Sequence, residues 1–329
     1  MHPRPATPAA CHCSVTRPAL YCDRVTVEEY RIGRGLARVS RPASLAIVTL
    51  AYLLGGLVAW AVAASFAGPH PIVVTLLADV AATLAVFAVS MVVANSSVYD
   101  PYWSVAPPVI AVAWAVYGDG VPLREIAVLA LILIWAVRLT VHWGGTWRGL
   151  AHEDWRYVDL RADTRGRLPW WLVSLGGIQL MPTLVVFLGM LSVWPVMTVD
   201  GRPFGVLDVV ATLITGAAIA IEAVADRQLR RFVAAPDRRG AIADRGLWRR
   251  CRHPNYLGEI AFWWGLWVFA LAAAPSWWWT VVGPVAMVVL FVTASIPLMD
   301  KRSLARRPGY ADWMKSVPAL VPSPRRTRA

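Results

Sequence analysis

Charged residues are scarce in this chain. Asp, Glu, Lys and Arg make up 16% of its 329 residues, against about a quarter in soluble domains. Hydrophobic residues make up 57% and the mean hydropathy is +0.52, which excludes an ordinary soluble enzyme. The apolar residues run continuously over about 20 positions instead of alternating, which excludes a transmembrane β-barrel. The composition therefore predicts an all-α protein, a polytopic transmembrane helical bundle.

Cysteine is rare as well, with four residues in the chain. Cys22 and Cys251 have no spacing partners, so the sequence indicates no disulfide framework. The triplet Cys11-His12-Cys13 lacks the further ligands of a closed tetrahedral site, and we predict no metal. Neither a G-x-G-x-x-G turn after a strand nor a Walker loop occurs, which excludes a Rossmann or P-loop domain.

Apolar runs predict about eight transmembrane helices, with seven as the alternative count. The runs cover residues 45–67, 72–94, 105–118, 123–142, 169–196, 206–225, 256–275 and 277–298. The third run is short for a full crossing, and the fifth is long and interrupted by Gly176, Gly177 and Pro182. We therefore expect one of these two to be re-entrant or broken.

Basic residues gather on one predicted side of the membrane. The leader (1–44), the loops 143–168 and 226–254, and the tail (299–329) hold 29 of the 32 Lys and Arg residues. The positive-inside rule then places both termini in the cytoplasm, with the bundle over residues 45–298 between them. The leader has no apolar core of a signal peptide, and we expect it to be disordered.

Ionisable side chains inside apolar spans are costly, so each one is a functional candidate. They are Asp79, Asp100, Arg138, His142, Asp208, Glu222, Asp226 and Glu259. Asp79 and Arg138 are expected either to pair or to line a water-filled pocket that holds the helices together. Asp208 lies at the outer end of a span, where we expect it to be solvated.

Glu222, Asp226 and Arg230 are four residues apart, which places them on one helix face. This pattern indicates either an interfacial salt bridge or part of a site. The loop that follows is dense in arginine, at positions 231, 238, 239, 245, 249, 250 and 252. Arginine forks match phosphate oxygens, so the loop favours either a lipid headgroup or a dinucleotide phosphate.

The segment from Gly246 to Glu259 carries the most specific pattern. Pro254 predicts that the seventh span begins here, with its N-terminus pointing into the arginine cluster. Such a helix start is a natural seat for phosphate. Asn255 and Glu259 would face the same way, with Tyr256 beside them. Helix packing explains the Gly and Trp residues of the segment, but not this convergence of polar groups.

The tail repeats this pattern on a smaller scale, with Asp300-Lys301-Arg302 followed by Pro308-Gly309-Tyr310 and Trp313. It emerges on the same predicted side as loop 226–254. We expect it to fold back and close the phosphate site.

These motifs resemble the steroid 5-alpha-reductase superfamily of membrane proteins, and most closely its bacterial branch. The resemblance covers about residues 95–325. It rests on Asn95-Ser96-Ser97 through Asp100-Pro101-Tyr102-Trp103-Ser104, on His152-Glu153-Asp154-Trp155-Arg156-Tyr157, on Ala225-Asp226-Arg227-Gln228-Leu229, and above all on Arg252-His253-Pro254-Asn255-Tyr256-Leu257-Gly258-Glu259.

The resemblance implies a bacterial inner-membrane protein that binds NADPH at its cytoplasmic end. It would reduce a carbon-carbon double bond conjugated to a carbonyl in a lipid-like or steroid-like substrate, with membrane lipids around it and no nucleic acid or known protein partner. The implied cofactor contacts are Asp226, Arg252, His253, Asn255, Tyr256 and Glu259, with Arg230, Arg231, Arg302 and Tyr310 as less specific ones. We add Glu222 and Trp248 as candidates, although steroid reductases tend to carry Asn at the position of Glu222. An acid must also meet the carbonyl oxygen as it gains charge. The candidates are Asp100 or Tyr102, together with His142, Glu153 or Tyr157.

Two alternatives stay open. The Arg-His-Pro-x-Tyr element also occurs in the membrane isoprenylcysteine carboxyl methyltransferases, which bind S-adenosylmethionine. A cationic sulfonium with one carboxylate suits a large arginine excess poorly, whereas the phosphates of NADPH pair well with arginine. The third interpretation is a non-catalytic lipid-binding protein with the same fold.

Overall fold

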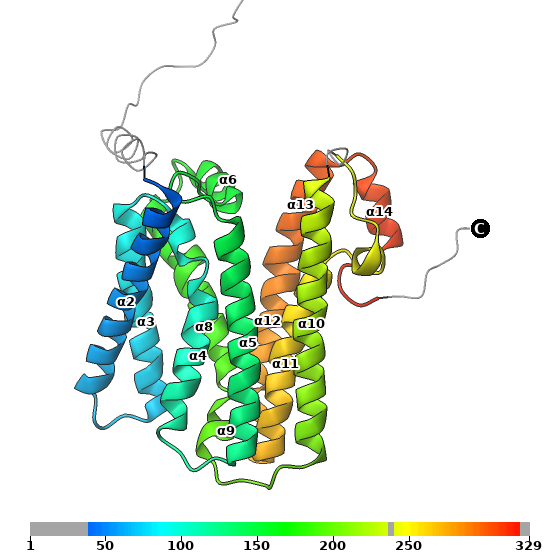
Figure 1. Ribbon diagram of the computed structural model, residues 1–329. Helices are drawn as coiled ribbons and strands as arrows, with labels where there is room; N and C mark the ends of the chain where they lie inside the picture. The colour runs from blue at the N-terminus through cyan, green and yellow to red at the C-terminus, as the bar shows by residue number, and fades with distance from the viewer. Residues whose placement is uncertain (1–38, 236–239, 323–329) are drawn as a thin grey trace, which may run out of the picture.

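The computed structural model describes residues 39–235 and 240–322 (Figure 1). Most of the expected leader, residues 1–44, and the Cys11-His12-Cys13 triplet lie outside the described residues. Within the described ranges every regular element is a helix, which confirms the predicted all-α bundle. No group of three or more His, Cys, Asp or Glu side chains suited to a metal occurs in these ranges.

Seven helical segments are long and apolar enough to cross a membrane, so the chain is described as an integral multi-pass membrane protein. They are α2 (Arg41–Ser65), α3 (Pro71–Val92), α5 (Pro122–Thr146), the continuous segment of α7 (Trp170–Val173), η2 (Ser174–Leu180) and α8 (Met181–Met190), then α10 (Val206–Ala234), α11 (Pro254–Ala273), and the continuous segment of η4 (Pro275–Val281), α12 (Val282–Leu290), η5 (Phe291–Ser295) and α13 (Ile296–Arg306). Short helices α6 (Trp155–Thr164), α9 (Trp194–Thr198), η3 (Gly246–Arg249) and α14 (Tyr310–Ser316) complete the described part.

The third predicted span is the short one. α4 (Tyr102–Ala115) has 14 residues, because residues 93–101 before it form an irregular turn instead of extending the helix. Ala94 takes a left-handed conformation with φ of 49°, and the 3₁₀ helix η1 (Ser96–Tyr99) follows. The fifth predicted span is continuous, and Gly176 and Gly177 lie in its π-helical part, η2. The described chain therefore has seven candidate spans and one shorter helix, α4, where the apolar runs predict eight spans.

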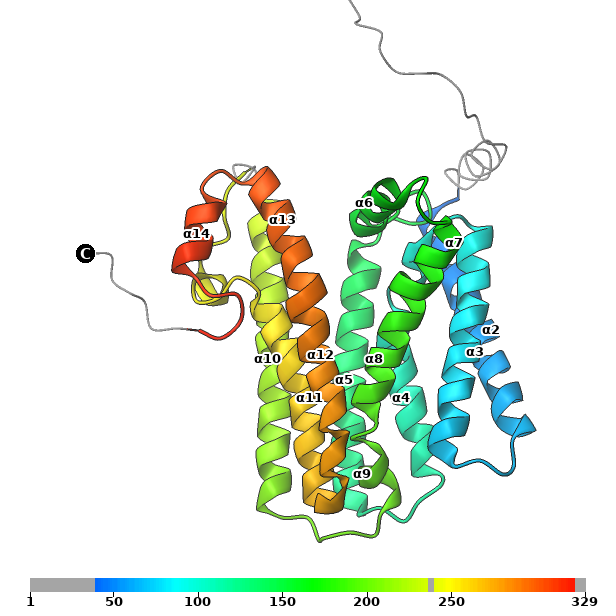
Figure 2. The same cartoon turned by 180° about the vertical axis from the view of Figure 1, so that it is seen from behind.

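The helices form a bundle with a clear order from one side to the other (Figure 1). α2 and α3 pair at one side, α10 to α13 pack together at the other, and α4, α5 and α8 lie between. From behind, α8 runs between α3 and α12 (Figure 2). The most extensive packing in the bundle is between α10 and α11.

Glycines on α11 permit that close packing. A Cβ atom at Gly258 would lie 2.8 Å from the carbonyl oxygen of Ala218, and one at Gly265 would clash with Thr215. Small residues at such contacts let two membrane helices approach each other. Gly258 thus serves the contact with α10, which brings Glu222 of α10 next to α11.

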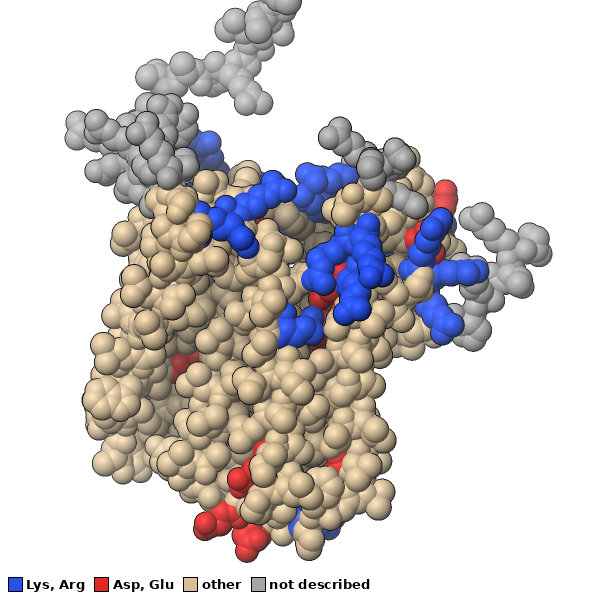
Figure 3. All heavy atoms as spheres, in the orientation of Figure 1, with Lys and Arg blue, Asp and Glu red and all other residues tan. Residues whose placement is uncertain are grey.

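Charge is unevenly placed on the described surface. Lys and Arg side chains gather at the end of the bundle where α6 and α13 lie, and exposed Asp and Glu side chains gather at the opposite end (Figure 3). The described chain also begins and ends near the basic end (Figure 1). This distribution is the one that the positive-inside rule uses to orient a membrane protein.

The opposite end holds a buried ion pair. Arg124 is 0% exposed and its Nε lies 2.6 Å from Oδ1 of Asp208, which is 1% exposed. The same guanidinium donates to the carbonyl oxygens of Arg202, Pro203 and Ala272. The expectation of a solvated Asp208 is therefore wrong, because the buried carboxylate accepts hydrogen bonds from Arg124 and from the backbone N–H of Gly205. The pair ties α5 to α10 and to the end of α11.

We predict that both ends of the chain are cytoplasmic. A C-terminal green fluorescent protein fusion should fluoresce and a C-terminal alkaline phosphatase fusion should be inactive, because the basic end resists translocation. An active phosphatase fusion would contradict the orientation.

We further predict that Arg124→Met destabilises the protein. It leaves Asp208 buried without its cation, which costs about 3 to 5 kcal/mol. Melting of the purified protein in detergent measures the loss. Arg202→Gln, which changes an exposed side chain in the adjoining loop, is the matched control and should melt like the wild type.

Candidate functional site

A cavity of about 180 Å³ lies where α11 begins. The end of α10, the loop before α11, and helices α13 and α14 enclose it. Its lining comprises Leu229, Ile242, Ala243, Trp248, Arg252, His253, Asn255, Tyr256, Met299, Arg302, Ser303, Arg306, Arg307, Tyr310 and Trp313. Seven of the twelve predicted cofactor residues are among them. Sequence reasoning missed Arg306 and Arg307, although both stand in the basic tail.

Asp300 of α13 does not line this cavity, but it bonds to residues from different walls of it. Its carboxylate accepts hydrogen bonds from Arg252 Nη2 at 2.8 Å and from the Tyr310 hydroxyl at 2.8 Å. The His253 Nε2 atom lies 3.0 Å from the same group. The start of α11 and the start of α14 therefore meet on one buried carboxylate.

The C-terminal tail seals the start of α11. The backbone N–H groups of Arg252 and His253 donate to the carbonyl oxygens of Pro318 and Ala319, at 2.9 and 3.0 Å. Arg252 Nη1 also donates to the carbonyl oxygen of Val317 at 2.6 Å. The tail thus lies against the segment as expected, and Arg252 is largely occupied by protein partners.

The surroundings of His253 favour the neutral form of its imidazole. Its ring stacks on Tyr256 with 5.3 Å between centroids. Burial lowers the pKa of His253, and the nearby Asp300 offsets this only in part. An imidazole without charge can stack and hydrogen-bond in the cavity wall without adding to the charge of the arginines.

The charge of the cavity lining is strongly positive. Arg252, Arg302, Arg306 and Arg307 line it, and no Asp or Glu is among the lining residues of the described chain. Because Arg252 is bonded to Asp300 and to the tail, the cations left to meet a ligand are those of α13 and of the turn that follows it.

The remaining predicted cofactor residues form a separate group between α5, α10 and α11. Arg138 lies 2.5 Å from Glu222 and 2.9 Å from Asp226, and His142 bonds to Arg230. Glu259 accepts hydrogen bonds from the indole N–H groups of Trp135 and Trp263, at 2.9 and 2.8 Å, and Arg231 is exposed. None of Glu222, Asp226, Arg230, Arg231 and Glu259 lines the cavity.

A second polar cluster lies at the same end of the bundle, where the Asn95 turn holds the segment before α6. Asn95 Nδ2 donates to the carbonyl oxygen of Leu150 at 2.9 Å, and Ser97 Oγ accepts from Asp154 N–H at 2.8 Å. Glu153 accepts from the backbone N–H of Ser96 at 2.9 Å. Two of the sequence motifs are therefore one folded unit.

Asp100 is the centre of this unit. The Tyr157 hydroxyl donates to Asp100 Oδ1, and Arg156 Nη2 lies 3.8 Å from the same oxygen. Burial raises the pKa of Asp100 to about 6, against the opposing effects of Arg156 and Tyr157. Burial also raises the pKa of Tyr157, so its phenol keeps its proton at neutral pH.

Tyr102 belongs to a neighbouring pair with Asp79. Its hydroxyl donates to Asp79 Oδ1 at 2.7 Å, and both residues are buried. The expected pairing of Asp79 with Arg138 is wrong, because α3 and α5 are separated by α4 and Arg138 is paired with α10. The Tyr99 hydroxyl and Thr83 both bond to Thr183, at 2.7 and 2.9 Å. Single Ser and Thr residues are common in membrane helices, so no sequence signal marked this network.

Arg302 connects the cavity with the Asp100 cluster. Its guanidinium lies 3.6 Å above the ring of Trp155 and 4.0 Å from Asp159, both on α6. The two groups of motif residues are therefore neighbours. His142 is the one catalytic candidate that lies with the Arg138 group instead.

Comparison with known proteins identifies the family of this chain. The "Uncharacterized protein C594.04c" of Schizosaccharomyces pombe is 27% identical to it over 283 residues, which are 77% of this chain and 80% of the yeast protein. No solved structure matches it significantly. The family description "Protein of unknown function (DUF1295)" matches residues 86–317, which include both polar clusters and the cavity. The chain belongs to the DUF1295 family.

Proposed function

We propose that this protein is a membrane-embedded, NADPH-dependent reductase of a carbon-carbon double bond conjugated to a carbonyl, acting on a lipid-like substrate. The observation that carries the proposal is the cavity lined by four arginines and no carboxylate, beside a buried acid-phenol pair. The first part suits an anionic cofactor and the second suits proton transfer.

The cavity fits the phosphates of a dinucleotide. Arg302, Arg306 and Arg307 present planar forks that match phosphate oxygens, and the start of α11 adds the positive pole of a helix. At about 180 Å³ it is smaller than the roughly 300 to 1,000 Å³ of whole ligand sites. It would hold the phosphate end of NADPH, with Tyr256 on the side nearest to the Asp100 cluster.

The chain's own residues would then supply the proton. Bound NADPH would supply the hydride for the β-carbon of the double bond. Negative charge would then develop on the carbonyl oxygen, and the Tyr157 phenol would donate a proton to it. Asp100, when protonated, can return a proton to Tyr157. Tyr102 with Asp79 is the alternative acid pair, and Glu153 positions the turn that carries Asp100.

S-adenosylmethionine fits this site less well. Its sulfonium is a cation, and four arginines would repel it. A carboxyl methyltransferase or a non-catalytic lipid-binding protein therefore stays a weaker alternative. Thermal shift of the purified protein with NADPH and with S-adenosylmethionine separates the three, since only a ligand of the folded form raises the melting temperature.

We predict that Arg306→Gln and Asn255→Ala each weaken NADPH binding. A lost charge-assisted contact corresponds to about a tenfold or greater increase in Kd for Arg306. Titration of NADPH fluorescence with protein in detergent measures it. Arg167→Gln, an exposed change outside the cavity, should bind like the wild type. Unchanged affinity in both cavity variants would exclude this cavity as the cofactor site.

We also predict a pH profile set by Asp100. Because its pKa is raised to about 6, the protonated form that can resupply Tyr157 disappears as the pH rises through that value. Steady-state oxidation of NADPH with a panel of enones should slow above about pH 6, by up to about tenfold per unit.

Two variants test the assignment of this profile. Asp100→Asn should flatten it and slow the reaction, and Tyr157→Phe should slow the reaction at every pH, both without change in the Kd of NADPH. Asp163→Asn on the exposed face of α6 should keep the wild-type profile. A pH step that persists in Asp100→Asn would assign it to another group.

A further inference from the structure

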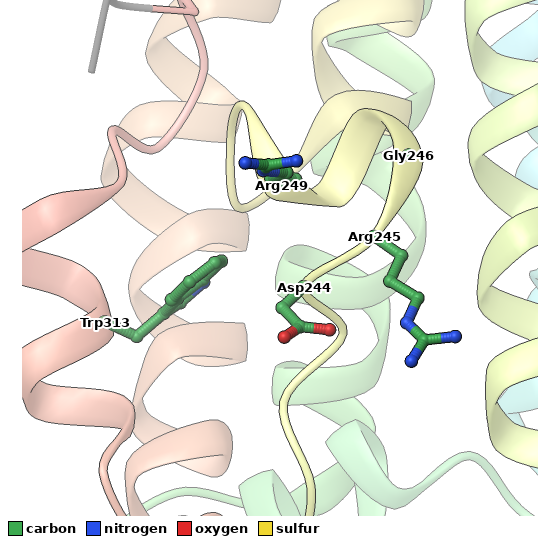
Figure 4. A pocket seen from close by; sticks show the side chains of 5 residues that line it. All are labelled: Asp244, Arg245, Gly246, Arg249 and Trp313. Carbon is green, nitrogen blue, oxygen red and sulfur yellow. The ribbon is translucent and has the colours of Figure 1, made fainter.

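An open groove lies on the outer flank of the bundle, between η3 and α14. It has a volume of about 400 Å³ and is lined by Asp244, Arg245, Gly246, Arg249 and Trp313. In the close-up, the Asp244 carboxylate and the Trp313 indole face each other (Figure 4). Arg249 lies above them in this view, and Arg245 lies on the side of Asp244 that faces away from Trp313. Of these residues only Trp313 also lines the cofactor cavity.

The charged groups of the groove have no partners within the described chain. Asp244, Arg245 and Arg249 are exposed, and their side chains form no ion pair or hydrogen bond with any residue in the described ranges. Asp244 does not pair even with the arginine that follows it. One anionic and two cationic groups are thus held a few residues apart, on a short helix and its entry turn, without neutralising each other.

The groove is level with the edge of the membrane-crossing part. η3 and α14 lie beside α10 and α13, below the upper ends of these two helices (Figure 1). The end at which they lie is the basic end of the bundle (Figure 3). Tryptophan is typical of this depth, where lipid headgroups meet the hydrocarbon.

We propose that this groove binds the zwitterionic headgroup of a phospholipid that carries an ammonium group. Arg245 and Arg249 bind the phosphate through charge-assisted hydrogen bonds. Asp244 and the face of Trp313 bind the ammonium, the carboxylate by charge and the indole by a cation-π contact. A purely anionic headgroup leaves Asp244 facing a negative ligand, so all four side chains find a role only with a headgroup of both charges.

The test is a titration of the full-length protein in a nonionic detergent. The probes are dihexanoyl phosphatidylethanolamine, dihexanoyl phosphatidylglycerol, which has no ammonium, and the soluble O-phosphoethanolamine. Stabilisation on heating reports binding, because each probe acts through its affinity for the folded form. We expect the phosphatidylethanolamine to bind about tenfold more tightly than the phosphatidylglycerol.

Three variants divide the site into its parts. Arg245→Gln with Arg249→Gln should weaken both lipids by about tenfold or more. Asp244→Asn should remove the preference for phosphatidylethanolamine and leave phosphatidylglycerol bound at least as well. Arg165→Gln with Arg167→Gln removes two exposed arginines from another loop at the same end and should behave like the wild type. The changed side chains are exposed, so melting without lipid should match the wild type.

Three outcomes would overturn the proposal. They are equal affinity for the two lipids in the wild type, affinity unaltered by the double arginine change, and a preference that survives Asp244→Asn. O-phosphoethanolamine binding as tightly as the lipid would assign the groove to a soluble phosphoamine and also overturn it. None of these measurements involves NADPH, so they succeed or fail independently of the reductase proposal.

Discussion

The carboxylate of Asp300 is the contact on which the cavity at the start of α11 depends. It receives Arg252 and His253 from the start of α11 and Tyr310 from α14. A carboxylate with this many donors is well compensated for its burial, and each donor is held in one orientation. Because it fixes Arg252 and His253, it also sets where the tail carbonyl oxygens of residues 317–319 can dock and where the cavity opens.

The same requirement explains the rest of the polar architecture. A charge within a membrane bundle has little access to water, so it is retained only with a partner. Arg124 pairs with Asp208 at one end, and Arg138 pairs with Glu222 and Asp226 nearer the other. These pairs each join α5 to α10. Arg306 and Arg307 of the cavity differ, since neither forms an ion pair with a carboxylate of the described residues, and that difference is the physical basis for assigning them to a ligand.

Several misplaced expectations share one cause. Periodicity along one helix places Glu222 and Asp226 on a common face, and the structure has them there, bonded to one arginine. It does not tell which other helix supplies that arginine, and the pair of Arg138 with Asp79, one of the two alternatives for these residues, is not formed. Asp208 was expected in water because it lies at a span end, but the chain folds Arg124 over it. Helix packing was enough to explain Gly258, but only the structure shows that the helix packed against it is α10.

The sequence by itself determined the helical membrane class, the position of most spans, the clustering of basic charge and the segment where α11 begins. These follow from local composition and from Pro254, which act over a few residues. Only the tertiary structure decided that the Asn95–Asp100 turn shortens α4, that Tyr157 reaches Asp100 and Tyr102 reaches Asp79, and that Arg306 and Arg307 line the cavity. The two contacts between a tyrosine hydroxyl and a carboxylate join residues 57 and 23 positions apart, and helix packing sets them.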